Sequence, residues 1–189
     1  WIENGRPRAK DQADRVIEDY LMSGTTTTGG IRWPGGLALR GERAFNFEYV
    51  RIVDARGQTT QIVEAGAPFW IEIGYQVRER LPHLRVNISV TTADGIHVLT
   101  SRDSDNDEFK GARDIGRFRT LCQIPAHFLN TGRYTVSVSA DIFGVRVLSR
   151  AEHALSLEVT ELGAVGSEWV EHRSGIVRPL LQWQREALK

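Results

Sequence analysis

Residues 69–77, Phe-Trp-Ile-Glu-Ile-Gly-Tyr-Gln-Val, decide the fold class, because large apolar residues stand at every odd position. Polar or small residues occupy most of the even positions. A period of two is typical of a β-strand with one face in a core and the other toward solvent. The same alternation recurs in residues 85–91 and 134–142. These stretches predict amphipathic strands of a packed sheet.

Shorter strand-like runs continue the pattern along the chain. They cover residues 44–53, 96–99, 118–124, 155–159 and 175–183, and turns such as Asp94-Gly95 separate them. Many strands of this length, divided by Gly and Asp turns, are the signature of a β-sandwich or barrel. No helical pattern of comparable quality follows residue 24. The sequence therefore predicts an all-β domain.

The N-terminal segment has a different pattern. Residues 1–6 are typical of a strand end that runs into an Asn-Gly turn. Asp11 can cap a short helix with an apolar stripe at helical spacing, and Gly24 can end it. Residues 23–30 have the composition of a flexible linker. We expect a division into residues 1–24 and 25–189, although the helix can equally pack on its own domain.

Composition limits the partners. Lys plus Arg and Asp plus Glu each number 24, and this zero formal charge argues against nucleic acid. Apolar runs are far shorter than the ~20 residues that span a bilayer. The single cysteine, Cys122, cannot form an internal disulfide, which fits a reducing compartment. Because the chain begins with Trp1 and has no basic-then-apolar leader, we expect a cytoplasmic domain excised from a longer protein.

Two parts of the chain resemble a known family. Residues 1–6 and 13–21 resemble the end of an ABC-transporter ATPase domain, in which a closing strand and turn precede a helix. The remainder resembles the C-terminal carbohydrate-binding domain of the ATP-binding subunit of O-antigen and polysaccharide ABC transporters, the Wzt family. The matching pieces are residues 50–54 with Gly57, residues 64–66, residues 91–95, residues 123–125 with 128–134, and residues 175–177 with Pro179 and Trp183.

This resemblance implies an immunoglobulin-like or jelly-roll antiparallel β-sandwich, with residues 1–24 as the tail of the preceding ATPase domain. It also implies that the domain recognises a lipid-linked polysaccharide in the cytoplasm, beside the inner membrane, and couples it to export. A homodimer and a membrane subunit, contacted through the ATPase domain, are the implied partners. Gly29-Gly30 and Gly35-Gly36 lack the following Lys-Ser/Thr of a phosphate-binding loop, so we expect no ATPase activity and no cofactor.

Signatures of catalysis or metal binding are weak. The five histidines are scattered without metal-ligand spacing. The acidic run at residues 103–108, with Asp114 beyond it, resembles the start of a calcium loop, but Glu108 stands where that loop needs Gly. A solvated inter-strand loop is the favoured interpretation. Cys122 shares the parity of Phe118 and Ile124, so we expect a buried filler rather than a nucleophile.

A glycan site needs amides, carboxylates and guanidinium groups beside an exposed aromatic ring. Strand alternation directs several such side chains outward, and they are the predicted carbohydrate-binding residues: Trp70, Glu72, Gln76, Arg85, Asn87, Ser89, Arg117, Arg119, Ser137 and Ser139. Two simpler interpretations stay open. These rows can be ordinary solvated sheet surface, and Trp70 can pack beneath a loop or a partner subunit.

Three functional hypotheses follow. The first is a non-catalytic glycan-binding module, and the second is a structural dimerisation domain of the ATPase subunit that binds no sugar. The third is a glycan-processing enzyme, which needs two carboxylates about 5–10 Å apart across a groove; Glu72 and Asp141 are the pair to test. Trp183 marks a final strand, joined through the segment around Gly163 and Gly166, that either pairs in its own sheet or is exchanged between protomers.

Overall fold

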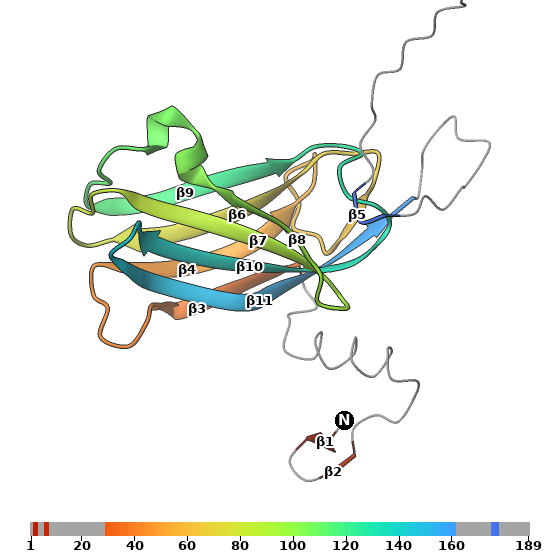
Figure 1. The fold of residues 1–189 in the computed structure, drawn as a ribbon, viewed down its shortest axis with the longest axis horizontal. Helices are drawn as coiled ribbons and strands as arrows, with labels where there is room; N and C mark the ends of the chain where they lie inside the picture. The colour runs from red at the N-terminus through yellow and green to blue at the C-terminus, as the bar shows by residue number, and fades with distance from the viewer. Residues whose placement is uncertain (1, 4–5, 8–28, 162–174, 178–189) are drawn as a thin grey trace, which may run out of the picture.

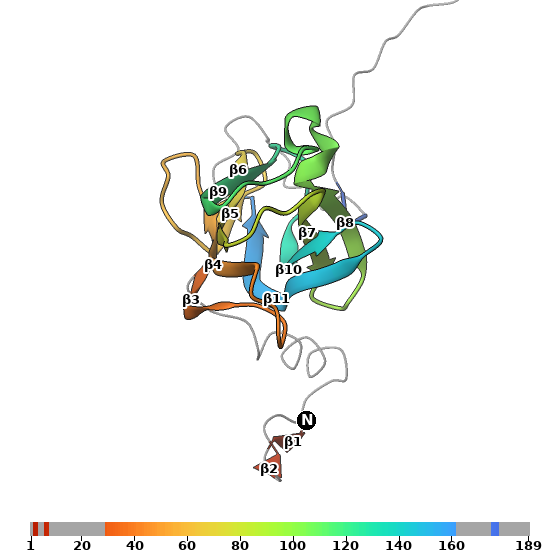
Figure 2. The same ribbon diagram turned by 90° about the vertical axis from the view of Figure 1, so that its left-hand side faces the viewer.

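The computed structural model describes residues 2–3, 6–7, 29–161 and 175–177, and it is nearly all β (Figure 1). Two sheets pack face to face. Seen along the strands, β3, β4, β6 and β9 lie on one side and β7, β8 and β10 on the other (Figure 2). The predicted β-sandwich is therefore confirmed.

The four-stranded sheet has the order β3-β4-β6-β9 and is antiparallel throughout. Its strands are β3 (Gly30–Leu37), β4 (Phe45–Val53), β6 (Phe69–Val77) and β9 (Gly116–Ile124). The five-stranded sheet has the order β5-β11-β10-β7-β8. Its strands are β5 (Ile62–Glu64), β7 (Leu84–Thr92), β8 (His97–Arg102), β10 (Gly132–Ile142) and β11 (Arg146–Thr160). Only the short pairing of β5 with β11 is parallel among the described strands.

The smaller elements are two 3₁₀ turns, η1 (Asp103–Asp105) and η2 (Asp107–Phe109), in the connection from β8 to β9. Strands β1 (Ile2–Glu3) and β2 (Arg6–Pro7) pair with each other, and the predicted Asn-Gly turn lies outside the described residues. The predicted helix that begins at Asp11 and the end of the predicted last strand, with Trp183, lie outside the described residues. No helix in the described part of the chain has the length and apolarity needed to cross a bilayer.

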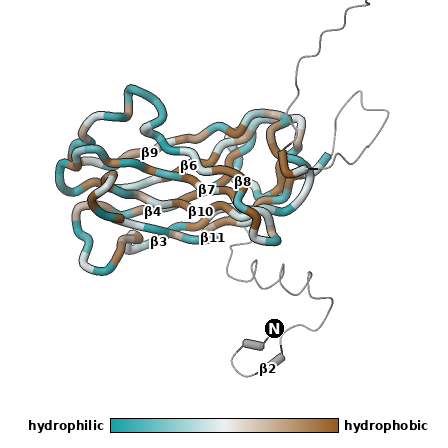
Figure 3. Tube along the Cα trace, in the orientation of Figure 1, coloured by the Kyte–Doolittle hydropathy of each residue, from teal (hydrophilic) through white to brown (hydrophobic). Residues whose placement is uncertain are grey.

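The core forms where the alternating residues of the two sheets meet. Every odd residue of β6 is at most 4% exposed, as the period of two predicts. Phe45 of β4 packs edge-on against Phe47 at 5.0 Å and stacks on Tyr75 at 5.3 Å between ring centroids. Hydrophobic colour follows the strands in Figure 3, whereas the hairpin loops are mostly hydrophilic.

The end of the predicted linker is ordered. Gly29 has φ +68°, and a Cβ there would lie 2.2 Å from the carbonyl oxygen of Thr60, so only glycine fits. Strand β3 follows at once and pairs with β4. The sequence analysis missed β3 because Pro34 and two glycines interrupt its alternation, a composition that is tolerated at a sheet edge.

The turn before β10 anchors the described part of the C-terminal segment. Tyr134 is 3% exposed, with its ring in the core as expected, and its hydroxyl donates to the Asn130 carbonyl oxygen at 2.9 Å. Asn130 Nδ2 donates to the Gly175 carbonyl oxygen at 2.7 Å, and Leu129 pairs with Val177. Residues 175–177 thus lie beside the start of β10.

Candidate functional site

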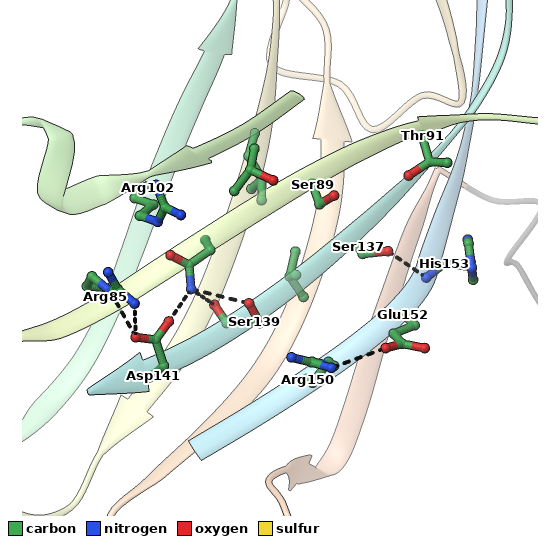
Figure 4. A pocket seen from close by; sticks show the side chains of 14 residues that line it. Arg85, Ser89, Thr91, Arg102, Ser137, Ser139, Asp141, Arg150, Glu152 and His153 are labelled. Carbon is green, nitrogen blue, oxygen red and sulfur yellow. Dashed lines mark hydrogen bonds and ion pairs between the residues drawn. The ribbon is translucent and has the colours of Figure 1, made fainter. Parts of the chain in front are cut away.

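A groove of about 520 Å³ lies on the outer face of the five-stranded sheet. Strands β8, β7, β10 and β11 form its floor and walls, and most of its side chains are polar (Figure 4). The lining residues are Arg85, Asn87, Ile88, Ser89, Thr91, Thr100, Arg102, Ser137, Val138, Ser139, Asp141, Arg150, Glu152 and His153. The predicted residues Arg85, Asn87, Ser89, Ser137 and Ser139 therefore come together in one groove.

Strand register explains why these residues meet. Asn87 of β7 lies opposite Arg102 of β8 on one side and opposite Ser139 of β10 on the other. Ser139 in turn lies opposite Arg150 of β11. Residues directly opposite in antiparallel strands share a face of the sheet. One polar row thus crosses four strands, and the next row places Ser89 between Thr100 and Ser137.

A hydrogen-bond network connects the side chains at one end of the groove. Arg85 Nε donates to Asp141 Oδ1 at 2.8 Å, and this ion pair joins β7 to β10. Asn87 Nδ2 donates to Asp141 Oδ2 at 2.7 Å and to Ser139 Oγ at 3.2 Å. Arg150 pairs with Glu152 at 3.4 Å on β11 (Figure 4). The bonds to Asp141 orient Arg85 and Asn87 before any ligand binds.

A β-bulge in β11 shapes the opposite wall. The register between β10 and β11 shifts after Val136, and His153 has φ +47°. Its backbone N–H donates to Ser137 Oγ at 2.9 Å, and its Nδ1 lies 3.0 Å from Thr135 Oγ1. A bulge bends its strand and re-aims side chains. Here it places the His153 ring at the groove (Figure 4).

An exposed aromatic ring stands beside the groove. Phe143, at the start of the β10–β11 hairpin, is 69% exposed, and the Arg85 guanidinium lies 4.3 Å from its ring centroid. Arg85 also lines the groove. The sequence analysis sought such an aromatic at Trp70 and missed Phe143, because a single Phe beside a Gly looks like ordinary turn composition.

The remaining predicted residues lie on the other sheet. Trp70, Glu72 and Gln76 are on β6, and Arg117 and Arg119 are on β9, at positions that alternate with the core residues. Trp70 is half-buried. Arg117 pairs with Glu48 at 2.9 Å. These five residues therefore lie on a different sheet from Arg85 and Asn87, because β6 and β9 belong to the four-stranded sheet.

Glu72 is only 3% exposed, so it is not available as a solvent-facing ligand. Tyr49 donates its hydroxyl hydrogen to Glu72 Oε1 at 2.8 Å, and Arg51 donates to Oε2 at 2.9 Å. Burial raises the pKa of Glu72, but the bonds from Arg51 and Tyr49 outweigh it and hold the pKa below its usual value. Tyr49 itself packs against Gly74 and beneath Arg32, whose guanidinium lies 4.9 Å from the ring centroid.

The proposed catalytic pair is wrong on geometry. Glu72 lies toward the outside of the four-stranded sheet, whereas Asp141 lies on the outer face of the five-stranded sheet. The sandwich core separates them, so they cannot face each other across one groove. The Asp141 carboxylate instead accepts hydrogen bonds from Arg85 and Asn87.

The acidic loop is organised around an arginine. Asp103 Oδ1 accepts the Val86 backbone N–H at 2.9 Å, and Oδ2 pairs with Arg113 at 3.0 Å. Asp114 pairs with Arg80 at the surface. Burial raises the pKa of Asp103. Within the described residues, no three His, Cys, Asp or Glu side chains gather closely enough to hold a metal.

Cys122 is half-buried and packs against the core from β9. Burial raises the pKa of its thiol, so little thiolate is present at neutral pH. This environment is that of a packing residue.

Sequence reasoning missed several groove residues. Strand alternation also directs Thr91 and Asp141 outward, but the sequence analysis did not include them among the predicted binding residues. Thr100 and Arg102 were missed because the predicted strand covered only residues 96–99 and no outward-facing residues were assigned to it. Arg150, Glu152 and His153 lie around the bulge, where strict alternation fails. The adjacent buried residues Ala154 and Leu155 were the available signal of that break.

The fold and the groove define a β-sandwich module with a polar hollow on one outer face. Comparison with known proteins then identifies its family. The model of the Wzt C-terminal domain matches residues 38–177, and the chain belongs to this family. It is thus a non-catalytic C-terminal domain of the ABC-transporter subunit for polysaccharide export.

One solved structure supports this fold. A crystal structure of the C-terminal domain of Wzt is similar, with a TM-score of 0.61 and 13% identity over 79% of this chain and 89% of that chain. The CARDB domain of a protein from Pyrococcus furiosus is more distant, with a TM-score of 0.34 and 12% identity over 59% of this chain and 93% of that chain. No curated protein matches the sequence.

Proposed function

We propose that this domain binds the exported polysaccharide in the groove of β8, β7, β10 and β11 without altering it chemically. Binding takes place in the cytoplasm, at the inner membrane, and couples capture of the lipid-linked glycan to export. The homodimer and the membrane subunit, contacted through the ATPase domain, complete the assembly. The observation that carries this proposal is the groove itself, which gathers Arg85, Asn87, Ser89, Ser137 and Ser139.

The groove has the size and chemistry that a glycan segment needs. Its volume of about 520 Å³ is typical of small-ligand sites. From Arg85 to Thr91 it follows β7 for roughly 20 Å, at about 3.3 Å per residue. Hydroxyl, amide and guanidinium groups supply both donors and acceptors for sugar hydroxyl groups.

Apart from Arg102, the arginines of the groove are paired with carboxylates, which suits a ligand that carries little charge of its own. Arg85 is neutralised by Asp141, and Arg150 by Glu152. The exposed ring of Phe143 adds an apolar surface for the C–H face of a sugar. Polar groups that are already hydrogen-bonded to each other also lose little side-chain entropy on binding.

The test is a calorimetric titration of the domain with the polysaccharide of its source strain. Ser89→Trp fills the centre of the groove with a bulky ring, whereas Gln123→Trp makes the same addition on the outer face of β9. We expect saturable binding that Ser89→Trp abolishes and Gln123→Trp leaves unchanged.

The alternative is a dimerisation domain that binds no sugar. A folded domain that shows no heat of binding at any polysaccharide concentration would support that alternative. Binding that survives Ser89→Trp would place the site outside the groove.

A further inference from the structure

One acceptor in the groove is buried without a partner. Asn87 is 7% exposed, and its Oδ1 accepts no hydrogen bond from any described residue. Its Nδ2 points the other way, toward Asp141 Oδ2, Ser139 Oγ and the Ser139 carbonyl oxygen. Because a carboxylate and a carbonyl only accept, they fix which end of the amide carries the hydrogens. No described residue supplies the donor that Oδ1 needs, and a bound ligand can supply it.

A donor without an acidic partner stands next to this acceptor. Arg102 lies directly opposite Asn87 on β8, with an expected Cβ separation of roughly 5 Å. Its exposed guanidinium lines the groove and forms no ion pair with any residue that the structure describes. Figure 4 shows Arg102 on the side of β7 away from Asp141. A buried acceptor without a described partner and an exposed guanidinium thus lie opposite each other on neighbouring strands of the same groove.

We infer that Asn87 Oδ1 and Arg102 together select a neutral sugar hydroxyl group, and this inference rests on the proposed function. A hydroxyl donates its hydrogen to Asn87 Oδ1, while its oxygen accepts an N–H from Arg102. One O–H group is both donor and acceptor, so it satisfies both neighbours at once.

An anionic group fits this place poorly. A carboxylate or a phosphate dianion has no hydrogen to donate, so Asn87 Oδ1 stays unsatisfied and faces a second acceptor. Arg85 is already paired with Asp141, so it offers little attraction to an anion. Arg102 alone, exposed to solvent, gives only a weak and salt-screened attraction.

The experiment uses the whole domain and an oligosaccharide released from the polysaccharide of its source strain. Binding is titrated at about 0.05 M and about 0.5 M NaCl, because exposed charge–charge attraction is strongly screened over this range. Inorganic phosphate serves as the competing anion. We expect the Kd to change less than about threefold with salt, and phosphate not to displace the sugar.

Variants identify the groups involved. Arg102→Met keeps the alkyl stem and removes the donors, so we expect a Kd weaker by roughly tenfold or more, the effect of one charged hydrogen bond. Arg102→Lys restores part of the affinity. Arg56→Met, at an exposed arginine in the turn after β4, is the matched control and leaves the Kd unchanged. The side-chain amide signals of Asn87 shift on binding in nuclear magnetic resonance spectra.

The outcomes separate the two proposals. Binding that phosphate or salt abolishes overturns the hydroxyl inference but keeps the glycan-binding function. Salt-insensitive binding with unmoved Asn87 amide signals and an inert Arg102→Met also overturns it. Absence of any binding by the folded domain overturns the glycan-binding function, and this inference with it.

Discussion

Gly74→Ala offers the sharpest test of how the four-stranded sheet is packed. A Cβ on Gly74 would lie 2.0 Å from Tyr49 Cε1, a distance that real side chains do not tolerate. Tyr49 must therefore move. Its hydroxyl then loses the 2.8 Å hydrogen bond to Glu72, and its ring loses the contact with Arg32.

The size of the effect follows from these losses. Overpacking a well-filled site costs about 1–3 kcal/mol. The hydrogen bond contributes about 1 kcal/mol and the cation–π contact about 0.5–1 kcal/mol. We expect Gly74→Ala to lower the free energy of unfolding by about 3 kcal/mol. With a urea m-value of about 2 kcal/mol/M, the unfolding midpoint falls by roughly 1.5 M.

Urea unfolding followed by tryptophan fluorescence measures this shift. Gly111→Ala is the matched control, because a Cβ there meets nothing within 4 Å, and we expect it to be neutral or slightly stabilising. In a Tyr49→Ala background the clash disappears, so Gly74→Ala should then cost little. A midpoint within error of the unsubstituted domain, or an equal cost in both backgrounds, would refute the reasoning.

Two further predictions concern single residues. Because the folded-state pKa of Glu72 is lowered, its stabilisation is present above the unfolded pKa of about 4.3 and is lost as pH falls through the folded value. Urea midpoints at pH 6 and pH 3 should therefore show Glu72→Gln less stable than the unsubstituted domain at pH 6, with a smaller gap at pH 3; a constant gap contradicts this. His153 has φ +47°, so His153→Val should destabilise the domain by about 1–2 kcal/mol and His153→Asn by less, in the same assay; equal effects of the two substitutions contradict the strain at the bulge.

The fold was predictable because its signal is local. Side-chain parity in β6, β7 and β10 follows from a period of two, and the buried residues match it. Strand β3 escaped because Pro34 and its glycines remove that period. Strand β5 is three residues long and pairs only with β11, far along the chain, so no local pattern could reveal it.

The site was predictable only in part, because it depends on which strands become neighbours. Parity directs Glu72 and Asn87 outward in the same way, yet their strands belong to different sheets. Nothing within residues 69–77 or 85–91 records that assignment. The bulge in β11 shifts the register and brings His153 into the groove, and a strict period of two cannot predict such a shift. The sequence therefore predicted which side chains point away from the core, but not which of the two sheets carries them.

Side-chain length explains why the hollow forms on the five-stranded sheet. The central strands β7 and β10 carry short residues on the outer face, including Ser89, Ser137 and Ser139, while the flanking strands carry the longer Arg102 and Arg150. Short side chains between rows of long ones leave a trough. The four-stranded sheet has the opposite arrangement, because its central strands carry Tyr49, Arg51 and Trp70 outward. The outer face of the five-stranded sheet therefore carries a hollow of about 520 Å³, against about 330 Å³ beside Arg32 and Arg51 on the four-stranded sheet. The trough depends on side chains rather than on the backbone, so a binding specificity located there can change while the sandwich stays intact.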